Sequence, residues 1–339
     1  MNVNEEHVQS FTKDWKKYDL LGEKVGHLIG EVLNLRGLKT HAISYRAKEI
    51  DSFRKKIAKK KYPDPLKDVT DLCGVRIIAY VEDDVLKICE QLRDLFDVDE
   101  DRSINKNVEL GADRVGYKSI HLICKLKRDR LNLPEYSAFS NAVFEVQVRT
   151  ILQHSWAEIE HDKNYKYSGV LPDNIRRRLM LLSGALEILD REFNSVSKEI
   201  DQYAEDVKGQ AIKGDLDITI DSVSLSEFLA LKFKDLFDRG LIREPYSIGS
   251  DILYELNNFG LFTLADFDNI IPEDFIGVVL LYPNFEHTVI SILRDLMLIH
   301  DFERYVRDCY DSRWIYYDDG NPLTKHYNFD MSRFDQFEP

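Results

Sequence analysis

The stretch that most constrains the fold is residues 143–166, which read VFEVQVRTILQHSWAEIEHDKNYK. The first half has a strand pattern and the second half a helix pattern. Side chains alternate between the two faces of a strand, so Glu145, Gln147 and Arg149 share one face and apolar residues occupy the other. An acid, an amide and a guanidinium are costly to bury without partners. We therefore expect these three side chains either to face water or to line a site.

The helix that follows repeats this division at its own period. The side chains that share its polar face have spacings of 4, 3 and 4 residues and are His154, Glu158, His161 and Tyr165. Its packing stripe is expected to consist of Leu152, Trp156 and Ile159. The simplest alternative is an edge strand followed by an amphipathic helix with a solvated polar side.

Charge divides the chain into two parts. The whole sequence of 339 residues has a net charge of −14. Residues 1–214 contain 36 basic and 36 acidic residues, whereas residues 215–339 contain 10 basic and 24 acidic residues. We therefore predict two domains, 1–214 and 215–339, and the acidic second one is unsuited to holding phosphates by bulk electrostatics.

Targeting signals and cysteine usage favour a cytoplasmic protein. No apolar run reaches membrane length, and the N-terminal segment is polar and acidic rather than a secretory signal. The four cysteines show neither CxxC pairing nor metal-ligand spacing, which predicts reduced thiols in the core.

A cationic stripe is the main feature of the N-terminal part. We expect one helix over residues 4–36 and a second over residues 42–61. On the second helix, spacings of 3 and 4 residues would align Tyr45, Lys48, Ser52, Lys56 and Lys59, with Arg46 beside them. A solvated lysine-rich face is the commoner fate of such a run. The functional alternative is a cradle for a polyphosphate, because fixed point charges suit one.

Three predicted strands carry polar groups on one face. The first covers residues 75–81 with Arg76, and Asp71 lies just before it. A helix over 82–97 and an irregular segment over 98–114 separate it from the second strand, on which Ser119 and His121 face away from the core. The third is the strand with Glu145. The order of elements predicts an α+β domain around a small mixed sheet, followed by one or two long helices over 173–210.

The C-terminal part is predicted to be mostly helical. We expect a short strand at residues 215–221, then two to four helices, with Thr263 capping one of them. No charged constellation there indicates chemistry. The density of aromatic residues suits a core or a docking surface.

Two carboxylates on one sheet suggest a metal. Asp71 and Glu145 could together hold Mg²⁺, which usually binds through one or two carboxylates and substrate phosphates. Lysines nearby favour phosphoryl-type transfer, in which positioning and charge neutralisation provide most of the catalysis. The absence of GxxxxGK[ST] argues against the commonest nucleotide-binding loop.

Three segments resemble the signature segments of RelA/SpoT-type alarmone synthetases, specifically the small single-synthetase class. They are DLCGVRI, RVGYKSIH and EVQVRTILQHSWAEIEHDKNYK, and the resemblance covers roughly residues 40–170 and continues to about 205. It implies a nucleotidyltransferase-like fold that moves the β,γ-pyrophosphate of ATP onto the 3′-hydroxyl of GDP or GTP. Toxin-type members of this family also carry extensions, and some modify the 3′-CCA end of tRNA or make adenosine alarmones.

The resemblance also implies a role for individual residues. Asp71 would bind Mg²⁺, and Glu145 would share the metal and act as general base on the 3′-hydroxyl. Arg46 and Arg76 would sandwich the adenine. The ATP phosphates would be held by Lys48, Ser52, Lys56 and Lys59. The acceptor would be placed by Tyr117, Lys118, His121, Gln147 and Lys163, with Tyr117 stacking on the guanine.

Several alternatives stay open at this point. Family members often carry arginine where Lys118 stands and a different loop at 105–114, so the acceptor could be a guanine nucleotide, an adenine nucleotide or tRNA. A metal hydrolase using His154, Glu158 and His161 is a different class of function. A binding module without catalysis is a further one.

Partners follow from the same considerations. The acidic region 215–339 could fold over the cationic site and restrain it, with release by a nucleotide, a regulatory protein or an antitoxin. An oligomerisation element is the plainer alternative, and we expect a homo-oligomer.

Overall fold

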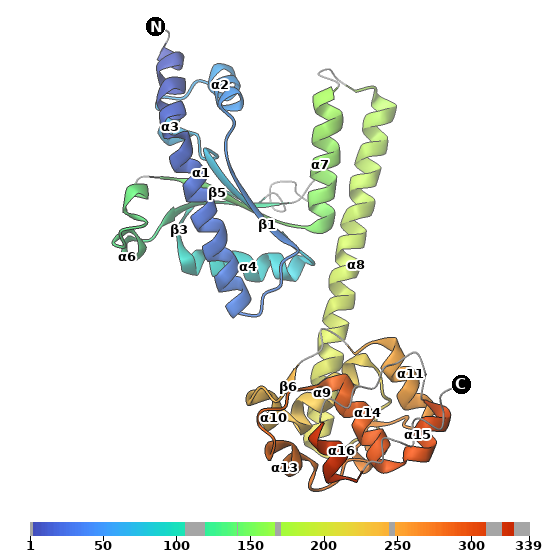
Figure 1. Cartoon of the computed structure of the whole chain (residues 1–339). Coiled ribbons are helices and arrows are strands. Elements are labelled where there is room, and N and C mark those ends of the chain that lie inside the picture. The colour runs from blue at the N-terminus through green and yellow to red at the C-terminus, as the bar shows by residue number, and fades with distance from the viewer. Residues whose placement is uncertain are drawn as a thin grey trace, which may run out of the picture. The chain divides into compact units, whose positions relative to one another are not determined.

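The computed structural model divides the chain into two compact units, Met1–Ser197 and Lys198–Pro339 (Figure 1). It describes residues 3–105, 119–140, 142–166, 171–243, 248–309 and 321–328. The division falls inside the long helix α8 (Asp173–Ile212), whereas the predicted boundary at residues 214 and 215 lies just after the end of that helix. The functional division at that boundary stays a prediction.

The first unit is built on a mixed five-stranded sheet, which confirms the predicted α+β class. The strand order is β1-β2-β5-β4-β3; β2 and β5 run parallel and all other neighbours run antiparallel. The strands are β1 (Ala42–Ala47), β2 (Cys73–Ala79), β3 (Phe96–Asn105), β4 (Ile120–Leu126) and β5 (Phe144–Thr150).

Helices cover one face of this sheet and leave the polar face open. α1 (Val3–Leu35) and α4 (Glu82–Leu95) pack on the face where Phe144, Val146 and Val148 are fully buried. The period-2 prediction for β5 is thus confirmed, because its apolar side forms the core. The remaining helices of the unit are α2 (Ile50–Lys59), α3 (Pro65–Asp68), α6 (Arg128–Leu131), the 3₁₀ turn η1 (Ser137–Phe139), α7 (Ile151–Lys166) and α8.

Close packing of α1 on β1 depends on two glycines. A Cβ built on Gly26 would lie 2.9 Å from Cδ1 of Tyr45, and one on Gly22 would lie 3.3 Å from the Tyr45 Cβ. The missing side chains let the tyrosine ring lie against the helix backbone. α1 therefore fixes the edge strand β1 in place.

Two predicted elements were wrong. Residues 42–47 form β1 rather than the first turns of a helix, so Tyr45 and Arg46 lie on a strand and Lys48 on the connection to α2. Residues 98–105 belong to β3 rather than to an irregular segment, because they form a ladder with β4. In both cases hydrogen bonding to a neighbouring strand outweighs the local pattern.

Helix α7 matches its predicted packing stripe only in part, since Leu152 is half-buried. Trp156 is buried, but Ile159, expected in the packing stripe, is 51% exposed. Tyr165 and His161 lie in the helix, and their side chains are outside the described residues.

The second unit is a helical domain with its own core, which confirms the predicted helical C-terminal region. Phe259, Phe267 and Phe275 are among its fully buried side chains. Thr263 caps α12 as predicted: its hydroxyl accepts from the Asp266 N–H, and the Asp266 carboxylate accepts from the Thr263 N–H.

The details of this unit differ from prediction. Among the described residues, 215–221 form only an isolated bridge between Thr219 and Thr263 instead of a strand, and the helices are shorter and more numerous than the two to four expected. They are α9 (Ser222–Lys232), α10 (Lys234–Asp238), α11 (Ser250–Asn258), α12 (Leu264–Asn269), α13 (Phe275–Leu280), α14 (Val289–His300), α15 (Phe302–Asp308) and α16 (Pro322–His326), with the short strands β6 (Ile242–Arg243) and β7 (His287–Thr288).

None of the described helices is both long enough and apolar enough to cross a membrane.

Candidate active site

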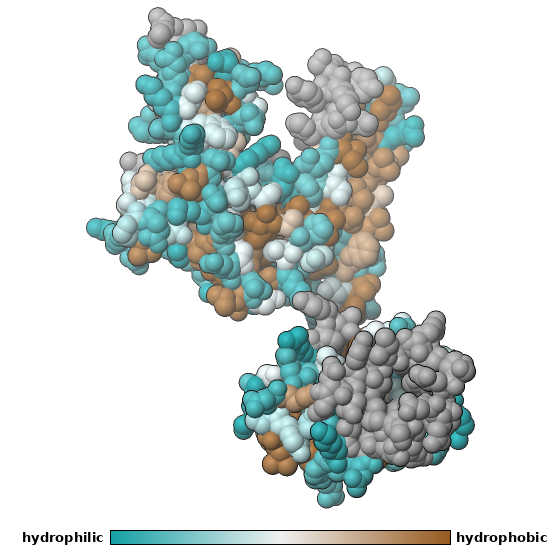
Figure 2. Space-filling view, viewed as in Figure 1, coloured by the Kyte–Doolittle hydropathy of each residue, from teal (hydrophilic) through white to brown (hydrophobic). Residues whose placement is uncertain are grey.

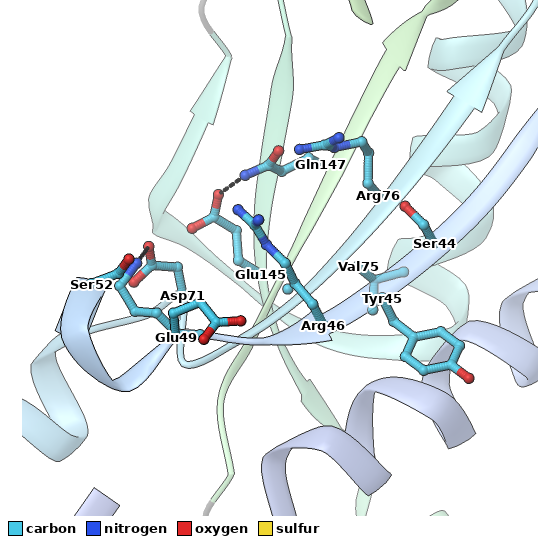
Figure 3. A pocket seen from close by; sticks show the side chains of 12 residues that line it. Ser44, Tyr45, Arg46, Glu49, Ser52, Asp71, Val75, Arg76, Glu145 and Gln147 are labelled. Atoms are coloured by element: carbon cyan, nitrogen blue, oxygen red, sulfur yellow. Dashed lines mark hydrogen bonds and ion pairs between the residues drawn. The ribbon is translucent and has the colours of Figure 1, made fainter. Parts of the chain in front are cut away.

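A cavity of about 290 Å³ opens on the polar face of the sheet (Figure 3). Its walls come from β1, β2, β5 and the start of α2, which are separated in sequence and are joined by the sheet. It is lined by Ser44, Tyr45, Arg46, Lys48, Glu49, Ser52, Asp71, Gly74, Val75, Arg76, Glu145 and Gln147.

Sheet register explains why these side chains meet. Arg46 is paired with Gly74, and Gly74 is paired with Glu145, so the glycine lies between the two charged residues. A Cβ on Gly74 would meet only the Arg46 carbonyl oxygen, at 4.0 Å. Since Gly74 has no side chain, the floor of the cavity stays open. The next row on the same face pairs Arg76 with Gln147.

Asp71 is the anionic centre of one end of the cavity. Its Oδ2 accepts from Nζ of Lys48 at 2.6 Å, and its Oδ1 accepts from Nζ of Lys56 at 2.9 Å. Burial raises the pKa of Asp71, but hydrogen bonds and charge from the two lysines outweigh this and hold the pKa below its ordinary value. The carboxylate is therefore ionised at neutral pH, with two cations beside it.

Glu145 is the second carboxylate and is only 8% exposed. Its Oε1 lies 2.7 Å from Nδ1 of His121 and accepts from Nε2 of Gln147 at 2.8 Å. Burial and the nearby charge of Asp71 raise the pKa of Glu145, whereas the contacts with His121 and Gln147 lower it, and the net result is a lowered pKa. Asp71 and Glu145 line the same cavity, and their sharing of a metal stays a prediction.

A hydrogen-bonded chain holds Glu145 in position. Behind His121, the Oγ of Ser119 lies 2.7 Å from Nε2, and Ser119 is 1% exposed. On β5, Oε1 of Gln147 accepts from Arg149, which is 4% exposed. Among the described residues, the contacts of Glu145 with His121 and Gln147 both involve Oε1.

Arg76 connects the cavity to α7. Nη1 of Arg76 donates to Oε1 of Glu158 at 2.9 Å, while Nδ1 of His154 lies 3.8 Å from the same oxygen. Arg46 and Arg76 both line the cavity, and their stacking on an adenine stays a prediction. No group of three His, Cys, Asp or Glu side chains that could hold a metal occurs in the part of the chain that the structure describes. The hydrolase alternative with His154, Glu158 and His161 is not tested by this, because the side chain of His161 lies outside the described residues.

Four residues that were predicted to bind ATP or the acceptor are not placed at the cavity by the structure. Lys59 is exposed near the end of α2 and is not among the residues lining the cavity. Tyr117 and Lys118 lie outside the described residues, and Lys163 lies on α7 with its side chain outside them.

Ser44 and Glu49 line the cavity and were missed. The sequence contained a signal for Ser44, because apolar and polar residues alternate from Ile43 to Lys48 as in a half-buried strand.

The donor set fits Mg²⁺. Two ionised carboxylates face one cavity, and hard carboxylate oxygens are the ligands that this cation takes from proteins. Both oxygens of Asp71 accept from lysine ammonium groups, so a metal ion there would compete with Lys48 and Lys56. The predicted ligands Asp71 and Glu145 therefore have suitable chemistry, and metal binding itself stays a prediction.

Comparisons with known proteins agree on one family. The family model described as "Region found in RelA / SpoT proteins" matches residues 45–170. GTP pyrophosphokinase YjbM of Bacillus subtilis (strain 168) is 30% identical over 164 residues, which cover 47% of this chain and 73% of YjbM. GTP pyrophosphokinase YwaC of the same organism is 29% identical over 161 residues, covering 46% of this chain and 73% of YwaC.

The crystal structure of small alarmone synthetase 1 from Bacillus subtilis has 26% sequence identity and a TM-score of 0.48, and the match covers 57% of this chain and 97% of that one. The identity to YjbM over most of its length, together with the family model, shows that the chain belongs to the RelA/SpoT family, in its small-synthetase class.

Proposed function

We propose that the chain transfers the β,γ-pyrophosphate of ATP to the 3′-hydroxyl of GDP or GTP, which makes it a Mg²⁺-dependent pyrophosphotransferase that produces (p)ppGpp. The observation that carries this proposal is the cavity in which Asp71 and Glu145 meet Lys48, Arg46 and Arg76. Relatives named GTP pyrophosphokinases support the same chemistry.

The reaction needs a base and a fixed acceptor. A bond forms between the 3′-oxygen and the β-phosphorus of ATP, the bond from that phosphorus to the α–β bridging oxygen breaks, and AMP leaves. Glu145 is ionised, so its Oε2 can accept the proton of the hydroxyl while Oε1 stays bonded to His121 and Gln147.

Charge neutralisation is the second requirement. The ammonium groups of Lys48 and Lys56 contact Asp71, and the phosphates of ATP would compete for the same donors. Ser52 lines the same end of the cavity and offers a hydroxyl. Mg²⁺ held by Asp71 and Glu145 would supply further neutralisation of the phosphate oxygens. Roles for Lys59, Tyr117, Lys118 and Lys163 rest on the family resemblance.

Acceptor choice is tested by labelling. The full chain is incubated with ATP labelled in its β- and γ-phosphates, Mg²⁺, and either GDP, GTP, an adenine nucleotide or bulk tRNA. Label in a guanine nucleotide supports the proposal. Label in tRNA or an adenine nucleotide instead would establish a toxin-type acceptor, and no transfer to any acceptor would overturn pyrophosphate transfer.

The acidic region 215–339 suggests a restraint on the site. Residues 215–339 contain 24 acidic and 10 basic residues, which favours interaction with a cationic cavity or with a basic regulatory protein. Removing residues 215–339 should then raise the transfer rate. An unchanged rate in a truncated chain that is still folded would eliminate restraint. We further propose a cytoplasmic setting, in which the four buried thiols stay reduced.

A further inference from the structure

Glu49 lines the cavity but has no part in the proposed reaction. Its residue is exposed, and among the described residues its carboxylate has no hydrogen-bond or ion-pair partner. Figure 2 shows many hydrophilic residues at the surface around α2, so a charge at the start of this helix does not by itself indicate a site. A place in the cavity wall does, because carboxylate oxygens without a protein partner are free to accept hydrogen bonds from a ligand.

Neither helix capping nor metal binding explains this residue. Glu49 is the N-cap residue of α2, yet its side chain makes no capping hydrogen bond. Serine, threonine, aspartate and asparagine are preferred at that position, because their short side chains reach the N–H groups of the first turn. No group of three His, Cys, Asp or Glu side chains that could hold a metal occurs among the described residues, so Glu49 is not a third ligand beside Asp71 and Glu145.

Hydrogen bonds hold the backbone on both sides of Glu49. The Lys48 N–H donates to the Leu72 carbonyl at 2.9 Å, and Nε1 of Trp15 donates to the Lys48 carbonyl at 3.1 Å. The carbonyl of Glu49 itself accepts from the N–H of Phe53 at 2.9 Å, and Phe53 is fully buried. The side chain therefore starts from a fixed point of the cavity wall, which lowers the entropic cost of binding a ligand there.

The order of side chains along the cavity follows the order of groups in ATP. Arg46 and Arg76 are the residues predicted to stack on the adenine, and Ser52 is predicted to hold a phosphate. Glu49 lies between Arg46 and Ser52 in the sequence, and Figure 3 shows its carboxylate between these two side chains. In ATP the ribose joins the base to the phosphates, so the ribose is the group expected beside Glu49.

We propose that Glu49 binds the ribose hydroxyls of the ATP donor and selects ribonucleotides over 2′-deoxyribonucleotides. This inference rests on the proposed function, in which ATP is the donor. The two oxygens of one carboxylate can accept from the neighbouring 2′- and 3′-hydroxyls of a ribose. An acidic residue recognises a ribose 2′-hydroxyl in this way in dinucleotide-binding folds.

The charge of Glu49 makes this contact selective. A carboxylate repels the triphosphate, and hydrogen bonds from the ribose hydroxyls offset that repulsion. A 2′-deoxyribonucleotide keeps the repulsion and loses one of the hydrogen bonds. Since hydrogen bonds to charged groups are stronger than those to neutral groups, we expect the missing hydroxyl to weaken binding about tenfold.

Calorimetric titration tests the contact directly. The full chain is titrated with ATP and with 2′-deoxy-ATP in the presence of Mg²⁺ and without an acceptor. The wild-type chain should bind ATP about tenfold more tightly than 2′-deoxy-ATP. In Glu49→Ala the two dissociation constants should differ by less than about twofold, because no carboxylate is left to distinguish the 2′-hydroxyl. A structural role alone would weaken both nucleotides equally and keep the wild-type preference.

Asp51→Ala is the matched control. Asp51 is an exposed carboxylate on α2 that contacts Arg54 at 2.8 Å and does not line the cavity, so this variant should keep the preference for ATP. Equal affinity of the wild-type chain for both nucleotides, or a preference that persists in Glu49→Ala, would overturn the inference. A preference that is lost only in Glu49→Ala would support it even if no label reached any acceptor, so the ribose contact and the proposed function fail separately.

Discussion

Replacing Glu145 with glutamine separates its chemical role from its structural one. Both donors from the described residues, His121 and Gln147, converge on Oε1 of Glu145. An amide oxygen in the place of Oε1 keeps both hydrogen bonds, while the amide nitrogen takes the place of Oε2. The donors then bond a neutral acceptor instead of a charged one, which lowers the free energy of unfolding by about 1 kcal/mol.

The effect on catalysis is expected to be far larger. An amide cannot accept the proton of the 3′-hydroxyl, and loss of a general base typically lowers the rate by about 100- to 10,000-fold. This corresponds to roughly 3–5 kcal/mol in the activation free energy. Steady-state transfer of label from ATP to GDP measures kcat and KM, and thermal unfolding measures stability.

The matched control is Glu100→Gln. Glu100 is a carboxylate on β3 of the same sheet, it is bonded to Arg93 at 2.7 Å, and it does not line the cavity. We expect this variant to keep wild-type kcat within about twofold, since exposed ion pairs contribute little. If Glu145→Gln kept more than about a tenth of the wild-type kcat, the assignment of Glu145 as general base would be refuted.

Three further predictions concern packing, the cavity floor and pH. Gly26→Ala places a methyl group 2.9 Å from the Tyr45 ring and should lower the free energy of unfolding by about 1–3 kcal/mol in urea titration, whereas Gly209→Ala, with open space around it, should not destabilise. Gly74→Val should leave the melting temperature nearly unchanged, because there is space for the side chain. It should raise KM for ATP about tenfold or more, because the new side chain fills the floor of the cavity. An unchanged KM would count against nucleotide binding in this cavity. Asp71→Asn should lower the free energy of unfolding by about 1–3 kcal/mol at pH 7. Because the lysines lower the pKa of Asp71, the stabilisation by its carboxylate is present above the ordinary pKa of 3.8 and is lost as the pH falls through the lowered pKa. The free energies of unfolding of wild type and variant should therefore converge in acid.

The part of the site predicted best is the part with strong local periodicity. The stretch from Phe144 to Lys166 alternates with a period of two and then changes to a helical period, and the structure places β5 and α7 accordingly. One buried face and one polar face leave a single possible register, so Glu145 and Gln147 had to share a side. Their convergence with Asp71 required the parallel pairing of β2 and β5, which only the tertiary fold supplies.

The missed elements are strands whose stability comes from their neighbours. β1 runs into a lysine-rich helix, and spacings of 3 and 4 fit its residues as well as alternation does. Packing of Tyr45 on glycines of α1 decides for the strand. β3 is rich in acidic residues and lies at the sheet edge, where its ladder with β4 and the bond from Ile123 N–H to Ser103 Oγ stabilise it. Neither contact can be read from the local sequence.

The burial of all four thiols gives the chain built-in reporters of local opening. Cys73, Cys89 and Cys124 lie in the core of the sheet, and Cys309 lies in the core of the helical unit. Burial raises the pKa of Cys73, Cys89 and Cys309 to about 12. A thiol that is both protonated and enclosed reacts with an alkylating reagent only after its surroundings unfold. The rates at which these sites are alkylated therefore measure, in one untouched chain, how often each of the two cores opens.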